Sequence, residues 1–532
     1  MAGYSRVWRG VFALAGLVVA IVPAWAVDAE WVRKLASSQT SIKVEAIEAL
    51  AQAADADALR LLTALQDGSL RVSASGAVVI VQGDQVLDAA TSQALASPPG
   101  DLESVTVNNR IRGRIESALS AFRLYADDPQ VRLKAAQELE VSSASPAVLR
   151  IVEKALAKEQ DPKIKPLLAL IKAGIDLKNS DPTVRLAAVR VLGESRQGKT
   201  QTLLATLLET ETVEEIRTEA GYALKSIKRR IALSEYGGRL FTGLSLGSIL
   251  LLVALGLAIT YGLLGVINMA HGEMLMIGAY ATFVMQQMVR QFAPGWFDWY
   301  LVMAVPFAFS SAAVVGIMLE RTVIRWLYGR PLETLLATWG ISLFLIQLVR
   351  QIFGPQNVEV SNPTWMSGGI EFTNVTLPYN RIVIIVFALA VLGGMWFVLA
   401  KTRLGLFIRG VTQNRGMAAC VGVNTHRVDV LAFGLGSGIA GLAGCALSQI
   451  GNVGPDLGQS YIIDSFMVVV LGGVGQLAGT VYAALGLGVA SKFLEPYIGA
   501  VPTKIMILVM IIAFIQKRPQ GLFALKGRAV EA

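Results

Sequence analysis

The sequence predicts an all-α polytopic membrane protein, preceded by an exported HEAT-like α-solenoid domain with a small β insert. Of its 532 residues, 54% are hydrophobic and only 16% are charged, a composition too apolar for a soluble protein. Long apolar runs fill the second half, and related helical segments recur in the first half. Together these observations predict a membrane domain at residues 236–532, with the repeats ahead of it.

The N-terminus has the pattern of an export signal. Two arginines, Arg6 and Arg9, precede an apolar run at residues 11–21, and the small residues Ala24 and Ala26 follow. We therefore expect residues 1–26 to be a signal peptide. The segment at 27–235 would then lie outside the cytoplasm, in the periplasm of a Gram-negative cell.

Residues 27–235 contain repeats that begin with Asp-Pro, at 128–139, 161–171 and 181–192. Aspartate is a good N-cap acceptor, and proline suits the first helical position because its missing N–H is not needed there. Such helices stack to bury faces that no single repeat covers, which predicts a HEAT-like solenoid. In the last repeat the expected buried face consists of Val184, Ala187, Ala188, Val191 and Leu192.

Two further stretches of this domain have different periods. Residues 41–65 predict a pair of helices. Residues 78–81 and 85–87, separated by a Gly-Asp turn, predict a β-hairpin, with residues 104–107 as a possible third strand.

Residues 193–200, GESRQGKT, match the phosphate-loop pattern G-x-x-x-x-G-K-T. A phosphate loop follows a buried strand, whereas residues 184–192 have helical periodicity and contain two arginines. We therefore expect Gly193 to end a helix and Gln197–Thr200 to lead into the next one, without a nucleotide site.

The membrane domain divides into about nine hydrophobic segments, each long enough to cross or enter a bilayer. With an external N-terminal domain, this number places the C-terminus in the cytoplasm. Basic residues then concentrate on the cytoplasmic connections, as the positive-inside rule requires. The segments lie near 239–264, 273–290, 301–323, 333–353, 381–400, 429–450, 463–476, 478–492 and 503–516.

Polar residues interrupt the first apolar stretch. No formal charge occurs from Leu240 to Gly272, which is too long for one span and predicts a span followed by a bent or re-entrant piece. Asn268, His271, Gly272 and Glu273 follow one another there. They either face a translocation path or hold a broken helix together, and Glu273 alternatively caps the next helix.

Other kinds of site are not indicated. The two cysteines, Cys420 and Cys445, and the two histidines are too scattered for a metal site or a disulfide. The net charge of +8 comes with no basic patch interleaved with aromatics, which argues against nucleic-acid binding and favours a membrane surface. We expect no catalytic residues, no metal and no cofactor.

The motif GVINMAHGE at 265–273 and several later motifs of the membrane domain resemble those of the permease subunits of the branched-chain amino acid family of ABC importers. The resemblance runs from residue 236 to the end of the chain. It implies a transport subunit of the bacterial inner membrane that works with a second related permease, two ATPase subunits and a periplasmic solute-binding protein. The motifs are GVINMAHGE (265–273), LERTVIRWLYGRP (319–331), KTRLGLFIRGVTQNRGMAACVGVN (401–424), VVVLGGVGQLAGTVYAALGLGV (468–489) and KRPQGLF (517–523).

In the basic connection at 401–428, residues 412–424 resemble the coupling helix that docks onto the ATPase of such importers. A solvated basic loop is the alternative, because inner loops are generally basic. The outer segment at 354–380 either contacts the solute-binding protein or simply connects two spans. The coupling residues that the resemblance implies are Thr412, Arg415, Met417, Ala418, Ala419, Gly422 and Asn424.

An exported helical domain ahead of this core resembles the urea-type permease subunits, which makes urea the first choice of solute. Branched-chain amino acids are the alternative within the family. A membrane-anchored solenoid scaffold or sensor is the alternative from another class, although nine segments exceed what an anchor needs.

Overall fold

The computed structural model describes residues 29–53, 55–73, 76–83, 85–91, 93–95, 100–141, 146–195, 197–265, 268–372 and 375–523. The chain divides after Arg230 into two compact units, and helix α10 (Glu214–Leu264) contributes residues to both. The predicted signal peptide lies outside the described residues.

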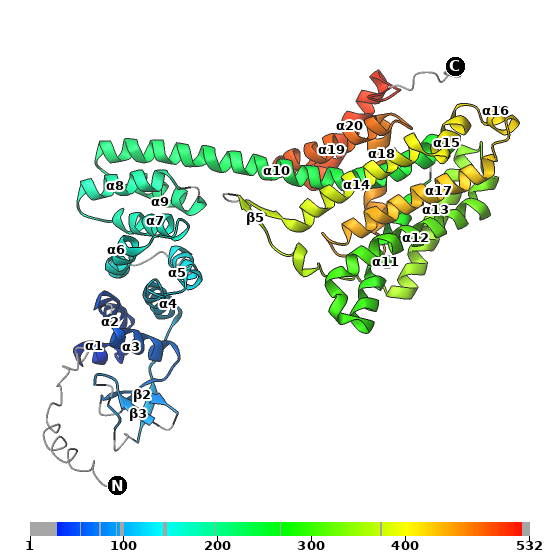
Figure 1. Ribbon diagram of the computed structural model, residues 1–532. Coiled ribbons are helices and arrows are strands. Elements are labelled where there is room, and N and C mark those ends of the chain that lie inside the picture. The colour runs from blue at the N-terminus through cyan, green and yellow to red at the C-terminus, as the bar shows by residue number, and fades with distance from the viewer. Residues whose placement is uncertain are drawn as a thin grey trace, which may run out of the picture. The chain divides into compact units, whose positions relative to one another are not determined.

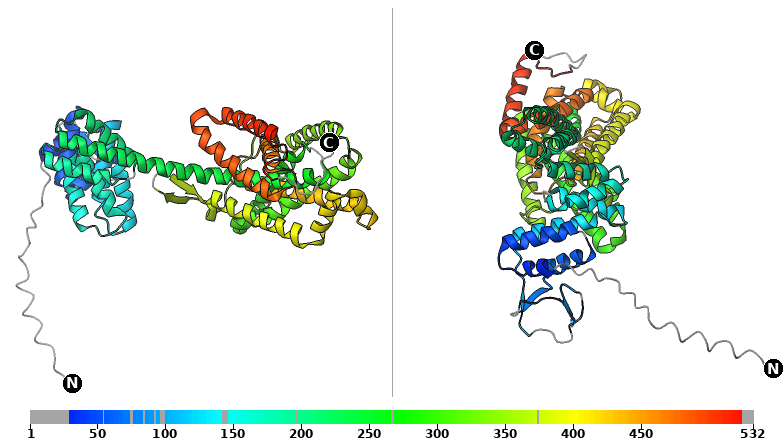
Figure 2. Two further views of the ribbon diagram at one scale, coloured as in Figure 1. Left: turned by 90° about the horizontal axis from the view of Figure 1, so that it is seen from above. Right: turned by 90° about the vertical axis from the view of Figure 1, so that its left-hand side faces the viewer.

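The first unit is built mainly from consecutive helices (Figures 1 and 2). The predicted helical pair at 41–65 is confirmed as α2 and α3. One apolar core runs through the unit, from Val32 on α1 to Ile175 on α7. The helices are α1 (Ala29–Leu35), α2 (Thr40–Ala53), α3 (Ala56–Gln66), α4 (Asn109–Arg123), α5 (Pro129–Val141), η1 (Pro146–Val148), α6 (Leu149–Lys158), α7 (Ile164–Asp176), α8 (Pro182–Gly193) and α9 (Gly198–Thr210).

A small antiparallel sheet follows α3, with strand order β3-β2-β1-β4. Its strands are β1 (Leu70–Ser73), β2 (Val78–Gln82), β3 (Gln85–Asp88) and β4 (Leu102–Ser104). The predicted hairpin is confirmed, since β2 and β3 pair from Val79–Asp88 to Gln82–Gln85. The third strand was predicted too late in the chain: β4 pairs with β1 and ends at Ser104.

The Asp-Pro pairs begin helices α5 and α8 as predicted. Asp181 accepts a hydrogen bond from the Thr183 N–H, and Asp128 accepts one from the Gln130 N–H. In the middle copy, α7 begins later, at Ile164.

The predicted buried face of α8 is wrong in part. Ala188, Val189 and Leu192 are buried, whereas Ala187 and Val191 are exposed. The helix is therefore rotated toward Val189. Arg185, which was expected to face away from the unit, is partly buried and pairs with Glu211.

Two repeats share the same partly buried Arg–Glu clamp. Arg185 Nε and Nη2 donate to the two carboxylate oxygens of Glu211 at 2.8 and 2.9 Å, and Nη1 donates to two backbone carbonyls. Arg132 makes the same contacts with Glu159, at 2.8 and 3.2 Å. Each glutamate also accepts two backbone N–H groups that follow it. Such bidentate pairs fix geometry as well as energy.

The phosphate-loop lookalike joins two helices. Gly193 ends α8 and Gly198 begins α9, so the strand that a phosphate loop needs is replaced by a helix. The Thr200 hydroxyl donates to Ser195 Oγ, and the Lys199 ammonium donates to the Glu140 carbonyl. Both side chains are thus engaged within the unit, as expected of a helix connection.

The second unit is a bundle of long helices in which α11, α12 and α17 pack on one another (Figure 1). Helix α17 is central. Of its apolar stretch 83% is buried, whereas only 17% of the apolar stretch is buried in α14 and in α20. The elements are α11 (His271–Phe292), η2 (Pro294–Trp299), α12 (Tyr300–Thr322), η3 (Ile324–Trp326), α13 (Pro331–Phe353), η4 (Thr364–Met366), β5 (Gly369–Phe372), β6 (Val375–Pro378), α14 (Tyr379–Lys401), α15 (Arg403–Gln413), α16 (Arg415–Cys420), α17 (Thr425–Leu447), α18 (Leu457–Gly472), α19 (Leu477–Ile498) and α20 (Ala500–Lys517).

Each of the nine predicted hydrophobic segments coincides largely with a helix. Within the described residues, seven helices are long and apolar enough to cross a membrane. The other two segments correspond to α18, which has only 16 residues, and α11, which carries charged residues at both ends. The sequence therefore located all nine of these helices.

We predict that Glu211→Gln lowers the hydrogen-exchange protection of α8 and α9, because it removes the charge that pairs with the partly buried Arg185 guanidinium. Hydrogen exchange of α8 and α9 peptides in the full-length protein measures this loss. Glu219→Gln is the matched control, since Glu219 meets Arg190 at 4.0 Å with both side chains largely exposed. Its effect should stay within about 0.5 kcal/mol, and equal effects of both variants would contradict the prediction.

The Arg185–Glu211 pair also predicts that the stability of the folded protein depends on pH. The Arg185 guanidinium lowers the pKa of Glu211 from 4.5 to about 2 in the folded protein. The stability that this pair contributes is therefore complete above pH 4.5 and disappears as the pH falls through about 2. The difference between wild type and Glu211→Gln should shrink over that window.

Candidate functional site

The chain leaves the helical conformation between α10 and α11. Gly265 follows the end of α10 with φ of 63°, and α11 begins at His271. Asn268 stabilises the turn between them, because its Oδ1 accepts the Ala270 N–H at 3.0 Å. The Met269 N–H donates to Thr338 Oγ1 on α13 at 3.2 Å. The described part of the predicted break thus contains a hydrogen-bonded turn at residues 268–270.

His271 is fully buried and faces α10. Its Nε2 lies 3.2 Å from the Val253 carbonyl oxygen. A carbonyl only accepts, so this contact requires the proton on Nε2. The ring fits because Gly256 has no side chain: a Cβ there would come within 3.1 Å of Nε2.

Glu273 is buried in the first turn of α11 and faces α13 and α18. Its Oε1 accepts a hydrogen bond from Ser342 Oγ at 2.7 Å, and no side-chain cap of α11 is formed. Its Oε2 has no hydrogen-bond partner among the described residues. That oxygen faces Gly458, where a Cβ would approach it to 2.8 Å. Glu273 is also a carboxylate in the first turn of α11, which is the position that the capping alternative requires.

Gly272 lies where α11 meets the start of α18. A Cβ on Gly272 would meet the Gly458 carbonyl carbon at 2.9 Å, so this crossing admits only glycine. Similar approaches occur between α11 and α17, where Gly278 lies against the Gly441 backbone. Small residues at such crossings let helix backbones come close in a membrane.

The four residues predicted from the sequence, Asn268, His271, Gly272 and Glu273, are thus buried together at the junction of α10, α11, α13 and α18. Two contributors from α13, Thr338 and Ser342, were missed. The sequence held a signal for them, because Thr334, Thr338 and Ser342 recur every four residues and form a polar stripe on an apolar helix. All three are buried.

The predicted coupling segment, residues 412–424, is not one helix. Thr412 lies in α15, the six-residue α16 spans Arg415–Cys420, and Asn424 caps α17. Asn414 and Asn424 interrupt the helix, since their Oδ1 atoms accept the N–H groups of Met417 and Arg427. The basic connection is therefore structured by its own N-caps.

Gly422 ends α16 in the left-handed conformation, with φ of 89°. The Gly422 N–H donates to the Ala419 carbonyl and the Val423 N–H donates to the Ala418 carbonyl, the bond pair of a Schellman motif. Ala418 is buried, whereas Met417 and Val421 are 61% and 72% exposed. The short helix thus buries the Ala418 side chain and leaves the apolar side chains of Met417 and Val421 exposed.

Arg415 fixes α16 to the start of α17. Its Nη1 donates to Asp429 Oδ1 at 3.3 Å, its Nη2 donates to the other carboxylate oxygen, and Asp429 is fully buried. The guanidinium also lies 5.2 Å from the centre of the Tyr328 ring, and the Tyr328 hydroxyl donates to Glu320 on α12. This cluster was not predicted, because its members are far apart in sequence.

The segment at 354–380, which the sequence predicts to be external, is held to the bundle. The Trp365 indole N–H donates to the Asp298 carbonyl at 2.9 Å, and Val358 pairs with Val453 in an isolated bridge. Strands β5 and β6 form a hairpin ahead of α14. No group of three His, Cys, Asp or Glu side chains within the described residues is placed to bind a metal.

The long apolar helices, their glycine crossings and the buried polar junction together define a polytopic helical membrane protein. Residues 239–515 match the family model described as branched-chain amino acid transport system / permease component. Because the match spans more than half of the chain, the protein belongs to this family. It starts at residue 239, so the first unit lies outside it.

Similar proteins carry related names. The high-affinity branched-chain amino acid transport system permease protein BraD of Pseudomonas aeruginosa is 30% identical over 296 residues, covering 54% of this chain and 95% of that protein. LivH of Escherichia coli K12, which has the same descriptive name, is 29% identical over 293 residues, 53% of this chain and 94% of LivH. A probable branched-chain amino acid transport permease of Methanocaldococcus jannaschii is 23% identical over 292 residues, 52% and 88% respectively. No solved structure matches the chain.

We predict that Gly278→Val disrupts the α11–α17 crossing, because the added atoms overlap the Gly441 backbone. Overpacking of this kind costs about 3 kcal/mol. Gly340→Val is the matched control, since Gly340 lies on α13 with no heavy atom within 4 Å of its Cβ position. The melting temperature in detergent should fall only for Gly278→Val, and an equal fall in the control would refute the assignment.

Proposed function

We propose that this chain is the permease subunit of an ATP-driven importer that moves urea across the bacterial inner membrane. Family membership supports the transport role. The helical unit ahead of the family core is the observation that favours urea, because the urea-type permeases resemble this architecture. A small neutral solute also suits a junction whose polar groups are few.

The proposed energy source is a pair of separate ATPase subunits. They dock at the coupling segment, where α16 presents Met417 and Val421 and is fixed to α17 through Arg415. A second, related permease completes the passage, and a periplasmic solute-binding protein delivers the solute. ATPase closure then shifts the helices between outward-open and inward-open states.

The proposed topology places residues 27–235 in the periplasm after a signal peptide at 1–26, and the C-terminus in the cytoplasm. The repeated Arg–Glu clamps support a HEAT-like solenoid for the first unit, since equivalent contacts recur in successive repeats. This domain would contact the solute-binding protein or the partner permease.

Asn268, His271, Gly272 and Glu273 are proposed to border the solute path. Buried ionisable groups within a membrane bundle are costly and usually serve function. The unpaired Glu273 Oε2 supports this role, since it is a polar atom at the junction with no described partner. The hydrogen bonds to Val253 and Ser342 equally support a role in holding the broken helix.

Import of branched-chain amino acids is the second candidate, favoured by the names of the related proteins. Uptake of labelled urea and labelled leucine, in cells with and without this chain, separates the two. We expect loss of urea uptake alone. Loss of leucine uptake alone would establish the second candidate, and unchanged uptake of both solutes would favour a membrane-anchored scaffold or sensor.

We predict that Gly422→Leu abolishes transport while the protein remains in the membrane. A leucine in the left-handed conformation costs about 1–2 kcal/mol, which would undo the Schellman end of α16 and displace the docking surface. Gly410→Leu is the control, because Gly410 in α15 has open space around its Cβ position and no positive φ. Uptake normalised to membrane protein measures both, and normal uptake by Gly422→Leu would remove the docking assignment.

A further inference from the structure

A surface recess lies where the end of α12 meets the start of α17. Its volume is about 560 Å³. Arginines from both helices and from η3 surround it, together with one histidine. The lining residues are Glu320, Arg321, Arg325, His426, Arg427, Val430 and Leu431.

The lining is positively charged and its arginines are unpaired. Within the described residues, no carboxylate oxygen lies within 4.0 Å of Arg321, Arg325 or Arg427. Glu320 is the single acid of the recess; it is buried, and its Oε1 accepts the Tyr328 hydroxyl at 3.2 Å. The recess therefore has three exposed guanidinium groups and one carboxylate, which is already hydrogen-bonded to Tyr328.

The start of α17 adds to this potential. His426 and Arg427 lie in its first turn, which contains no acidic residue. A helix N-terminus carries partial positive charge and favours anions, so cations at this end are unfavourable unless an anion neutralises them. The arrangement therefore indicates an anionic ligand.

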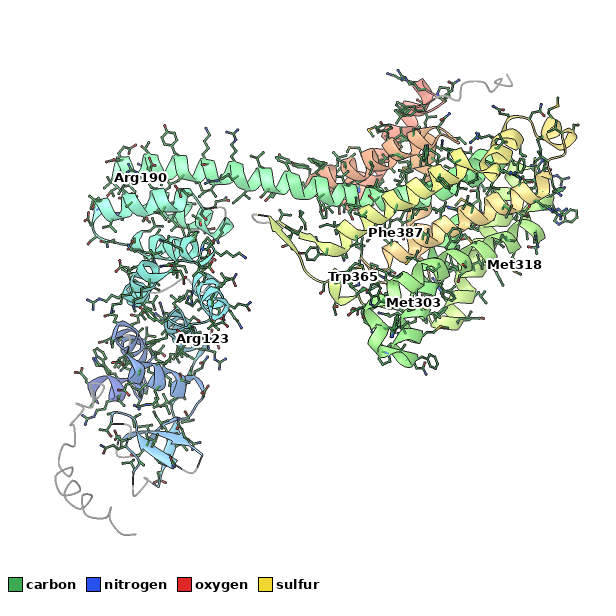
Figure 3. The ribbon with its side chains drawn as sticks, in the orientation of Figure 1. Arg123, Arg190, Met303, Met318, Trp365 and Phe387 are labelled. Atoms are coloured by element: carbon green, nitrogen blue, oxygen red, sulfur yellow. The ribbon has the colours of Figure 1, made fainter. Side chains whose placement is uncertain are left out.

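The recess also adjoins exposed apolar surface. On α12, Val314 and Met318 are 64% and 63% exposed one turn apart, leading toward Arg321 (Met318 is labelled in Figure 3). On α17, Leu431 is 52% exposed, one turn from Arg427. Trp326, the last residue of η3, is 75% exposed. Exposed apolar residues that end at a tryptophan and arginines are typical of the membrane–water interface.

We propose that this recess binds the phosphate headgroup of an anionic phospholipid. The arginines hold the phosphate, while the acyl chains lie along the exposed apolar face of α12, beside Leu431 of α17. The apolar border distinguishes this ligand from free phosphate and from an acidic segment of a partner protein, neither of which needs it. The site is independent of the transported solute.

Titration of phosphatidylglycerol and phosphatidylcholine into the full-length protein in detergent, followed by native mass spectrometry, tests the proposal. The double variant Arg321→Gln, Arg427→Gln removes two guanidinium groups. Its Kd for phosphatidylglycerol should rise about 30-fold, as expected from roughly 1 kcal/mol per basic residue. The control Lys517→Gln, Arg518→Gln removes two charges at the end of α20, outside the recess, and should leave that Kd unchanged.

Melting temperatures measured without anionic lipid confirm that both variants are folded, and Arg325→Gln provides a milder replacement if the double variant is not. Equal binding of the two lipids, or an unchanged Kd in the recess variants, would overturn the proposal. Displacement of phosphatidylglycerol by millimolar inorganic phosphate would identify a free-anion site instead. Loss of ATPase subunit binding with normal lipid binding would reassign the recess to a partner protein.

Discussion

Close backbone contact between α11, α12 and α17 is the constraint on which the membrane unit depends. Lipid is as apolar as the helix surfaces, so burial alone gives little drive and packing must supply the attraction. Gly278 and Gly441 provide it by letting α11 and α17 touch, and Gly444 lies against Leu275 in the next turn of the same crossing. Gly316 brings α12 against Ser437 in the same way. The central position of α17 follows from these crossings.

The buried polar junction also depends on glycines, because they have no side chain to fill the space that the polar groups occupy. The His271 ring occupies space that a Cβ at Gly256 would take, and Glu273 lies beside Gly458 for the same reason. A buried polar group costs free energy unless it is hydrogen-bonded, which Val253 and Ser342 supply for one atom of each side chain. The close packing and the polar contacts therefore depend on each other. The break between α10 and α11 is tolerated because neighbouring helices supply hydrogen-bond partners for its polar groups.

More of the structure could be predicted from local sequence signals than from contacts between residues that are far apart in the sequence. Apolar runs located the helices, and Asp181 marked the start of α8, because both act within a few residues. The face that α8 buries was predicted less well, since the Arg185–Glu211 pair joins positions 26 residues apart. Ser342 was missed for the same reason, its partner Glu273 being 69 residues away. The break at Asn414 was readable as an N-cap, but the family resemblance favoured one continuous helix there.

A force applied at α16 has a direct physical route to the polar junction. Arg415 joins α16 to the buried Asp429 of α17, so the two move together unless an ion pair breaks. Helix α17 in turn meets α11 at glycine crossings with no room for sliding side chains. Packed interfaces of this kind shift as units rather than deform gradually. Displacement of α17 is therefore transmitted to α11, the helix whose first turn carries His271 and Glu273.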